Sequence, residues 1–129
     1  MAVKLLYEIE LTGLTRREAE ERIGRKLRRT EVRDFTLALV NQTLENLAEI
    51  DKIIAGVAEN WDISRMAVLD RTILRLGVAE ILFSEVPDKV AMNEAIEIAK
   101  RFSTDNSGRF VNGILDKVAR MKGDLRSNI

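Results

Sequence analysis

The chain has 129 residues, of which 46% are apolar and 33% are charged, and its 21 basic and 21 acidic side chains cancel. This length is sufficient for a hydrophobic core, so we expect residues 1–129 to form a single domain without support from a metal or a disulfide. Zero net charge excludes strong unspecific attraction to nucleic acid or to an anionic membrane, so any binding of nucleic acid must come from a local patch.

The sequence contains no Cys, which excludes disulfides and thiolate chemistry and is the usage expected in a reducing compartment. Acidic Glu8 comes too early for a secretory signal. No stretch approaches the roughly 20 apolar residues that a membrane span requires. We therefore expect a cytoplasmic protein.

Apolar residues at helical spacing predict three helices in the first half of the chain. We expect a short helix over 2–11, a surface helix over 15–27, and a long amphipathic helix over 30–59 that bends near 47–49. Asn60-Trp61-Asp62 ends the long helix. No alternating strand pattern is present, so this half is predicted to be entirely helical.

The second half is also predicted to be helical. Residues 64–69 are expected to form a short turn of helix at a corner. The segment 70–83 is apolar nearly all round, which a helix tolerates only when other elements cover it, so we predict a buried central helix. Two more helices are expected over 90–102 and 106–121, joined by the polar segment 103–108.

The composition argues against an enzyme. Without His and Cys there is no Ser-His-Asp or Cys-His system and no imidazole or thiolate metal site. The glycines form neither a Gly-x-Gly-x-x-Gly motif nor a Walker loop. Glu94 and Glu97 share a helix face, but a solvated face is strongly favoured over a carboxylate metal site. We predict no catalytic activity, no cofactor and no metal.

The segment 103–108 is the strongest candidate for a binding site. The start of the following helix offers backbone amides with partial positive charge, accompanied by the Ser107 hydroxyl and the Arg109 guanidinium, which together suit a phosphate. Lys100 and Arg101 approach from the preceding helix, and Phe110 offers a face on which a base could stack. The alternative is that the polar residues only cap the helix and Phe110 belongs to the core; the residues alone favour this alternative.

Arg75 lies inside the otherwise apolar central helix. It is expected either to form a buried ion pair, with Glu94 or Glu97, or to contact a ligand at a groove. The ion pair is slightly favoured.

Several segments of the sequence, taken in order, carry a resemblance to known proteins. They are Leu69–Leu82, Val86-Pro87, Val90–Phe102, Ser107–Lys117 and, upstream, Ala2–Gly13. These segments resemble the NusB family. The resemblance is closest over about fifty residues in the second half, extends upstream to a first helix and Trp61, and so covers nearly the whole chain.

The resemblance implies an all-α fold of about seven helices in two packed sub-bundles. It also implies a bacterial transcription antitermination factor without catalytic activity. Its partners would be the ribosomal protein NusE, the boxA element of nascent RNA and the elongating RNA polymerase, which the complex keeps moving through ribosomal RNA operons.

The family's functional residues can be carried over by position. Phosphate contacts would come from basic side chains, stacking from aromatic rings, and hydrogen bonds from Asn and Ser. Asp70 falls where the family meets NusE. The RNA side would comprise Tyr7, Arg75, Lys100, Arg101, Asn106, Ser107, Arg109 and Phe110.

One difference from the family concerns the N-terminus. Members usually carry an arginine-rich run ahead of the first helix, whereas here only Lys4 is a nearby cation. Fewer phosphate contacts would weaken RNA binding and its dependence on salt, or shift the affinity onto the partner. Asn106 stands where an acidic residue can occur in the family, and a neutral amide repels phosphate less.

Two alternatives remain at this point. NusB-like domains also form the N-terminal part of RNA cytosine methyltransferases, where they assist substrate binding. A protein-interaction module without RNA binding would also fit the zero net charge.

Overall fold

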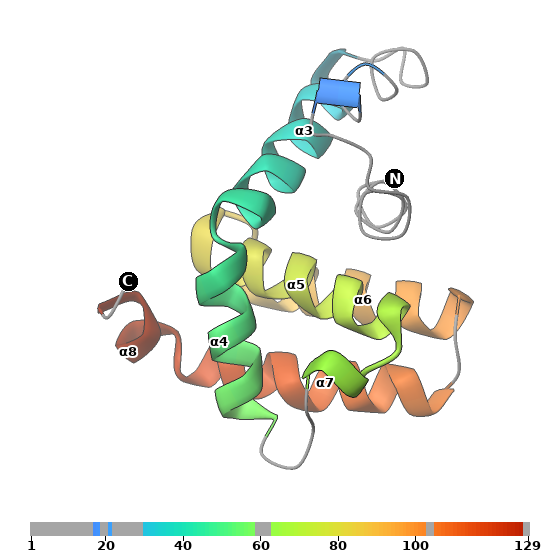
Figure 1. Cartoon of the computed structure of the whole chain (residues 1–129), viewed down its shortest axis with the longest axis vertical. Helices are drawn as coiled ribbons and strands as arrows, with labels where there is room; N and C mark the ends of the chain where they lie inside the picture. The colour runs from blue at the N-terminus through green and yellow to red at the C-terminus, as the bar shows by residue number, and fades with distance from the viewer. Residues whose placement is uncertain (1–16, 19–20, 22–29, 59–62, 103–104, 128–129) are drawn as a thin grey trace.

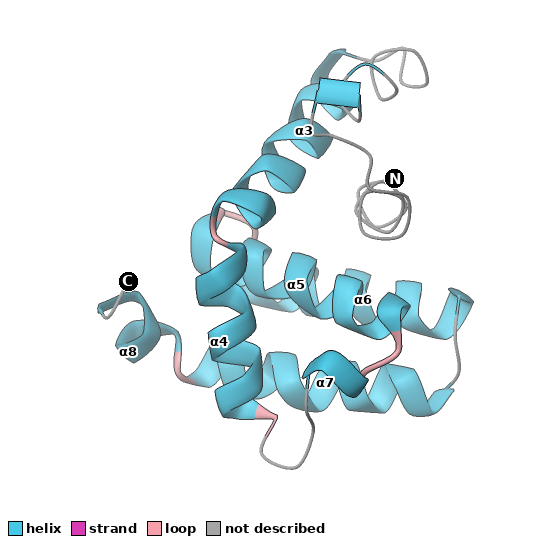
Figure 2. Ribbon diagram, viewed as in Figure 1, coloured by secondary structure: helices cyan, strands magenta, loops and turns pink. Residues whose placement is uncertain are grey.

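The computed structural model describes residues 17–18, 21, 30–58, 63–102 and 105–127, and every regular element within them is a helix (Figures 1 and 2). The all-α prediction is therefore confirmed for these residues. The expected helix over 2–11 and nearly all of the one over 15–27 lie outside them, as does Tyr7. The elements are α3 (Thr30–Glu45), α4 (Leu47–Val57), the 3₁₀ turn η1 (Ile63–Arg65), α5 (Val68–Phe83), α6 (Asp88–Phe102), α7 (Asp105–Arg120) and α8 (Lys122–Ser127).

The predicted long helix over 30–59 is two helices, α3 and α4, which separate at Asn46 (Figure 1). The Asn46 side-chain amide donates a hydrogen bond to the Gln42 carbonyl at 2.8 Å, while the Asn46 backbone N–H also points to this carbonyl, at 3.2 Å. An Asn side chain that competes for a helical carbonyl favours a local departure from the helix. The bend was predicted one residue too late.

Helix α5 is the buried centre of the fold, as predicted. It packs against α3, α4, α6, α7 and α8. Ile73, Leu74, Val78, Ala79 and Ile81 are all 1% exposed or less, which explains why this segment is apolar on nearly every side. The helix begins at Val68, two residues before the predicted start, because the Arg71 backbone N–H already donates a hydrogen bond to the Ala67 carbonyl at 3.0 Å.

Gly77 allows α5 and α7 to approach closely. A Cβ atom at Gly77 would lie only 2.8 and 2.9 Å from the two terminal methyl carbons of Leu115, which is fully buried in α7. A larger residue at this position would force the buried Leu115 side chain to shift or the two helices to separate.

The remaining helices follow the prediction with shifted ends. Helix α6 begins at Asp88, two residues before the predicted start, because the Pro87 carbonyl accepts hydrogen bonds from Val90 and Ala91. The short helix α8 was not predicted; a 3.0 Å ion pair between Lys122 and Asp88 fastens it to the start of α6. Among the described helices, none has the length and apolar character needed to cross a membrane.

Candidate nucleic-acid interface

The starts of α5 and α7 meet at a hydrogen bond between two of the predicted site residues. The Ser107 hydroxyl donates to Asp70 Oδ2 at 3.2 Å, and Ser107 is only 9% exposed. The Ser107 hydroxyl was expected to be presented to the solvent, where it would suit a phosphate. This expectation was wrong, because the hydroxyl is buried and donates its hydrogen bond to Asp70. The residue assigned to RNA and the residue assigned to the protein partner are thus in direct contact.

A pocket of about 340 Å³ opens between these two helix starts. Its apolar wall comes from Met66, Ala67 and Phe110, and Asp70, Asn106 and Ser107 add polar groups to its lining. The Oδ1 atom of Asp70 is buried and has no hydrogen-bond donor among the described residues, which is energetically unfavourable. We call this cavity the α5–α7 pocket; its lining is Arg65, Met66, Ala67, Asp70, Asn106, Ser107 and Phe110.

Exposed cations occupy the end of α6 and the start of α7. Lys100 and Arg101 occupy the last turn of α6, where the helix dipole favours positive charge, and Arg109 lies near the start of α7. Among the described residues, neither Lys100 nor Arg109 forms an ion pair. Their charges are therefore available to an anionic ligand, which the start of α7 also favours.

Phe110 combines the two predicted roles. It is half-buried and packs against the hydrophobic core, yet it also lines the α5–α7 pocket. Asn106, one turn earlier, is exposed and lines the same pocket. The segment 103–104 lies outside the described residues.

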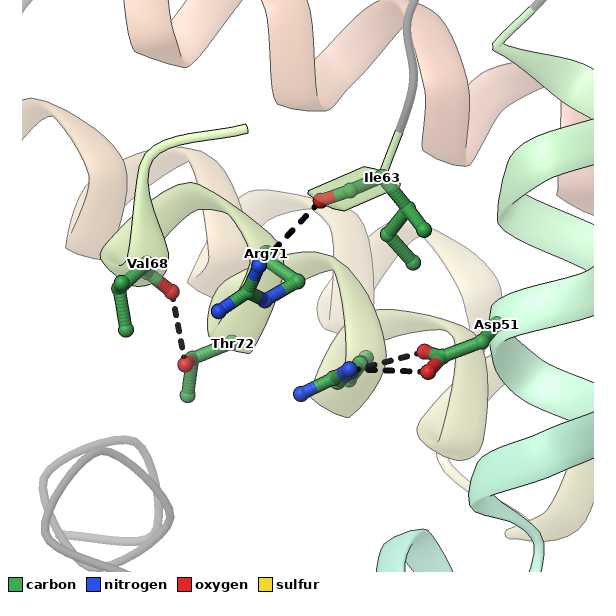
Figure 3. A network of polar contacts seen from close by, with 6 residues as sticks. Asp51, Ile63, Val68, Arg71 and Thr72 are labelled. Carbon is green, nitrogen blue, oxygen red and sulfur yellow. Dashed lines mark hydrogen bonds and ion pairs between the residues drawn. The ribbon is translucent and has the colours of Figure 1, made fainter. Parts of the chain in front are cut away.

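Arg75 does not line this pocket and forms an ion pair with Asp51 of α4. Figure 3 labels Asp51, whose carboxylate accepts the contact. Its Nε and Nη2 atoms donate to the two Asp51 carboxylate oxygens, each at 2.8 Å. The predicted partners, Glu94 and Glu97, were wrong because both lie on the exposed face of α6. The Arg75 and Asp51 side chains are 17% and 28% exposed, so the pair joins two helices in a partly buried position.

Sequence reasoning missed the contribution of the corner before α5. Arg65, Met66 and Ala67 line the pocket, and nothing in their local sequence signals a contact with residues forty positions later. Arg71 Nη1 of α5 donates a hydrogen bond to the Ile63 carbonyl at 3.3 Å and so joins this corner to α5 (Figure 3). Within the first turns of α5, Thr72 Oγ1 donates to the Val68 carbonyl at 2.8 Å.

Glu80 is a buried acidic residue of α5 whose pKa is perturbed. Burial, and after it the charge of Glu94, raises the pKa of Glu80 from 4.5 to about 7. No group of three or more acidic side chains that could hold a metal is found in the part of the chain that the structure describes.

An all-helical protein whose conspicuous surface features are a pocket and a group of exposed cations belongs to the class of binding proteins. Within that class, the NusB family model matches residues 1–120, and the chain belongs to the NusB family of transcription antitermination proteins. This family is non-enzymatic. The resemblance and the prediction that the chain is not an enzyme are confirmed.

Relatives in other bacteria carry the same description. The chain is 41% identical over 123 residues to the transcription antitermination protein NusB of Chloroherpeton thalassium, covering 90% of this chain and 56% of that protein. It is 40% identical over 130 residues to the NusB of Pelotomaculum thermopropionicum, covering 97% and 88%. The chain thus spans little more than half of the first relative and most of the second.

Solved structures show the same fold. T. maritima NusB superposes with a TM-score of 0.84 at 34% identity, covering 99% of this chain and 92% of that one. A chain from the crystal structure of antitermination factors NusB and NusE in complex with dsRNA superposes with a TM-score of 0.82 at 27% identity, covering 92% and 90%. The predicted NusB-like all-α fold is confirmed.

Proposed function

We propose that this chain is an RNA-binding adaptor of transcription antitermination. Together with NusE it binds the boxA element of nascent RNA in the cytoplasm and keeps RNA polymerase elongating through ribosomal RNA operons. Family membership and the similarity to a chain solved with NusE and RNA support this proposal. We also propose that residues 1–129 act as one domain.

The observation that carries the RNA part of the proposal is the group of exposed cations at the α6–α7 junction. Lys100 and Arg109 have no ion-pair partner among the described residues, although the protein has as many acidic as basic side chains. In a chain without net charge, such a group supplies the local attraction to phosphate that overall charge does not. Lys100, Arg101 and Arg109 are the proposed phosphate contacts.

The pocket supports the base-binding and partner-binding parts. Phe110 provides an aromatic edge and Asn106 an exposed amide for a base or ribose, and Ser107 fixes the start of α7 through Asp70. On the Asp70 side, the apolar wall of Met66 suits an apolar side chain of a protein partner, which we assign to NusE. Tyr7 and Arg75 complete the proposed RNA-binding set, with Arg75 acting as a support of α5 through Asp51.

Binding of a fluorescently labelled boxA RNA, measured with and without NusE between about 50 and 200 mM salt, tests the proposal. We expect NusE to tighten binding, and the logarithm of the affinity to fall by about 0.7 per phosphate contact for each tenfold rise in salt. A scrambled RNA of equal length is the control. Equal affinity for both RNAs in the presence of NusE would contradict the proposed function.

A further inference from the structure

Gly108 is a buried glycine of α7 that lies beneath the side chain of Lys100. A Cβ atom at Gly108 would be 3.2 Å from Lys100 Cγ, 3.6 Å from Lys100 Cε and 3.8 Å from Ile96 Cγ2. The aliphatic stem of Lys100 therefore crosses from α6 onto α7 directly over the glycine. Its ammonium group is one bond beyond Cε and lies close to the first turns of α7.

This arrangement places an unpaired charge beside a helix start. Lys100 belongs to the last turn of α6, yet its stem rests on the part of α7 where backbone amides carry partial positive charge. No acidic side chain among the described residues forms an ion pair with it. Asp70 faces the same helix start through Ser107 but forms no ion pair with Lys100, so the ammonium and the amides of α7 together still favour an anion beside the lysine.

Resting on Gly108 also restricts the lysine. An exposed lysine normally loses much rotamer freedom when it binds a ligand, and this loss opposes binding. A stem already in van der Waals contact with two helices has less freedom to lose. The space left by the missing side chain at position 108 is what permits this contact.

We propose that Gly108 is a positioning residue for RNA binding. Because it has no side chain, it lets Lys100 lie where its ammonium group and the start of α7 act on the same phosphate of the RNA. This inference rests on the proposed function. A methyl group at position 108 would lie 3.2 Å from Lys100 Cγ, so the lysine stem must give way by a few tenths of an ångström, which an exposed side chain does more easily than the backbone of α7. The fold would remain, while the Lys100 stem would no longer rest in its present position on α7.

Gly108→Ala tests this, with Gly113→Ala as the matched control in the same helix. A Cβ atom at Gly113 would meet nothing within 4 Å, so that variant changes helix propensity alone. We expect neither variant to lower the thermal midpoint, because Ala favours helix more than Gly. Gly108→Ala should weaken binding of boxA RNA in the presence of NusE by about threefold and reduce the salt slope by up to about 0.7, whereas Gly113→Ala should match the wild type.

The role of the lysine is tested by combining Gly108→Ala with Lys100→Met, which keeps the stem and removes the charge. If the glycine acts through the lysine, Gly108→Ala has no further effect on RNA binding in the Lys100→Met protein. Wild-type affinity in Gly108→Ala, or an equal loss with and without Lys100, would overturn the inference while RNA binding by the wild type upheld the proposed function. A wild type that binds boxA RNA no better than scrambled RNA would overturn both.

Discussion

Ser107 and Arg109, two residues apart in α7, have opposite surroundings. Ser107 is buried against Asp70, whereas Arg109 is exposed to the solvent. Positions two apart on a helix point in nearly opposite directions, so one turn supplies both the anchor and the proposed RNA contact. The anchor fixes the start of α7, and the cation keeps its charge in the solvent.

Arg109→Ala should therefore weaken binding of boxA RNA in the presence of NusE by roughly threefold to tenfold and reduce the salt slope by about 0.7. The free energy of unfolding should change by less than about 0.5 kcal/mol, because the side chain is exposed. RNA titrations across a salt series and thermal unfolding provide the two measurements.

Lys117→Ala is the control for this prediction, because Lys117 is an exposed cation in the last turn of the same helix, away from the pocket. It should leave RNA binding nearly unchanged. A loss of thermal stability in Arg109→Ala that matched its loss of RNA binding would instead assign Arg109 to the support of the fold.

The residue types of the site could be predicted from the sequence, but their orientation could not. Helix starts, cations and aromatic rings are local features, and these pointed to Lys100, Arg109 and Phe110. The inward turn of Ser107 depends on Asp70, which is 37 positions away. No local pattern encodes such a contact, because it arises only when α5 and α7 pack.

At the scale of helices, the sequence likewise predicts local features but not the contacts between elements. The helical spacing of apolar residues predicted α5, α6 and α7 with ends within about two residues of the observed ones. The partner of Arg75 could not be found in this way, because α4 and α6 both pack on α5 and both carry acidic residues. The structure selects Asp51, which lies on α4 beside the fully buried Ile50.

The ion pair between Arg75 and Asp51 should contribute to the stability of the fold. Arg75→Met and Asp51→Asn should each lower the free energy of unfolding by about 2 kcal/mol, because each removes this partly buried ion pair. The double variant should lose clearly less than the sum of the two. Chemical denaturation of the three proteins measures these values.

RNA titrations of the two single variants separate support from direct contact. If Arg75 acts by holding α5 against α4, any change in RNA affinity should be the same for Arg75→Met and Asp51→Asn. A loss of RNA binding confined to Arg75→Met would show that this side chain contacts the RNA itself.

At the scale of the whole molecule, the hydrophobic core contains an ionisable side chain whose burial is unfavourable when it is charged. Among the buried residues of α5, between Ala79 and Ile81, is Glu80, a carboxylic acid that is only 7% exposed. One of its oxygens, Oε2, has no hydrogen-bond partner among the described residues. Burial disfavours the charged form, and the nearby Glu94 adds repulsion, so the pKa of Glu80 is raised to about 7.

The stability of the whole fold should consequently respond to this one residue between pH 4.5 and about 7. The unfolded chain releases the Glu80 proton near pH 4.5 and the folded protein retains it to about 7, so the folded state binds more protons in this window. The contribution of Glu80 to stability is therefore complete below the lower value and is lost as the pH rises through the higher one.

Glu80→Gln, which does not titrate, should gain stability relative to the wild type over this range, and the gain should level off above it. Denaturation of both proteins at intervals from about pH 4 to 8 gives this difference, with exposed Glu97→Gln as the control. A Glu80→Gln protein whose stability runs parallel to that of the wild type at every pH would show that Glu80 ionises in the folded state as it does in the unfolded chain, and that α5 accommodates its charge without cost.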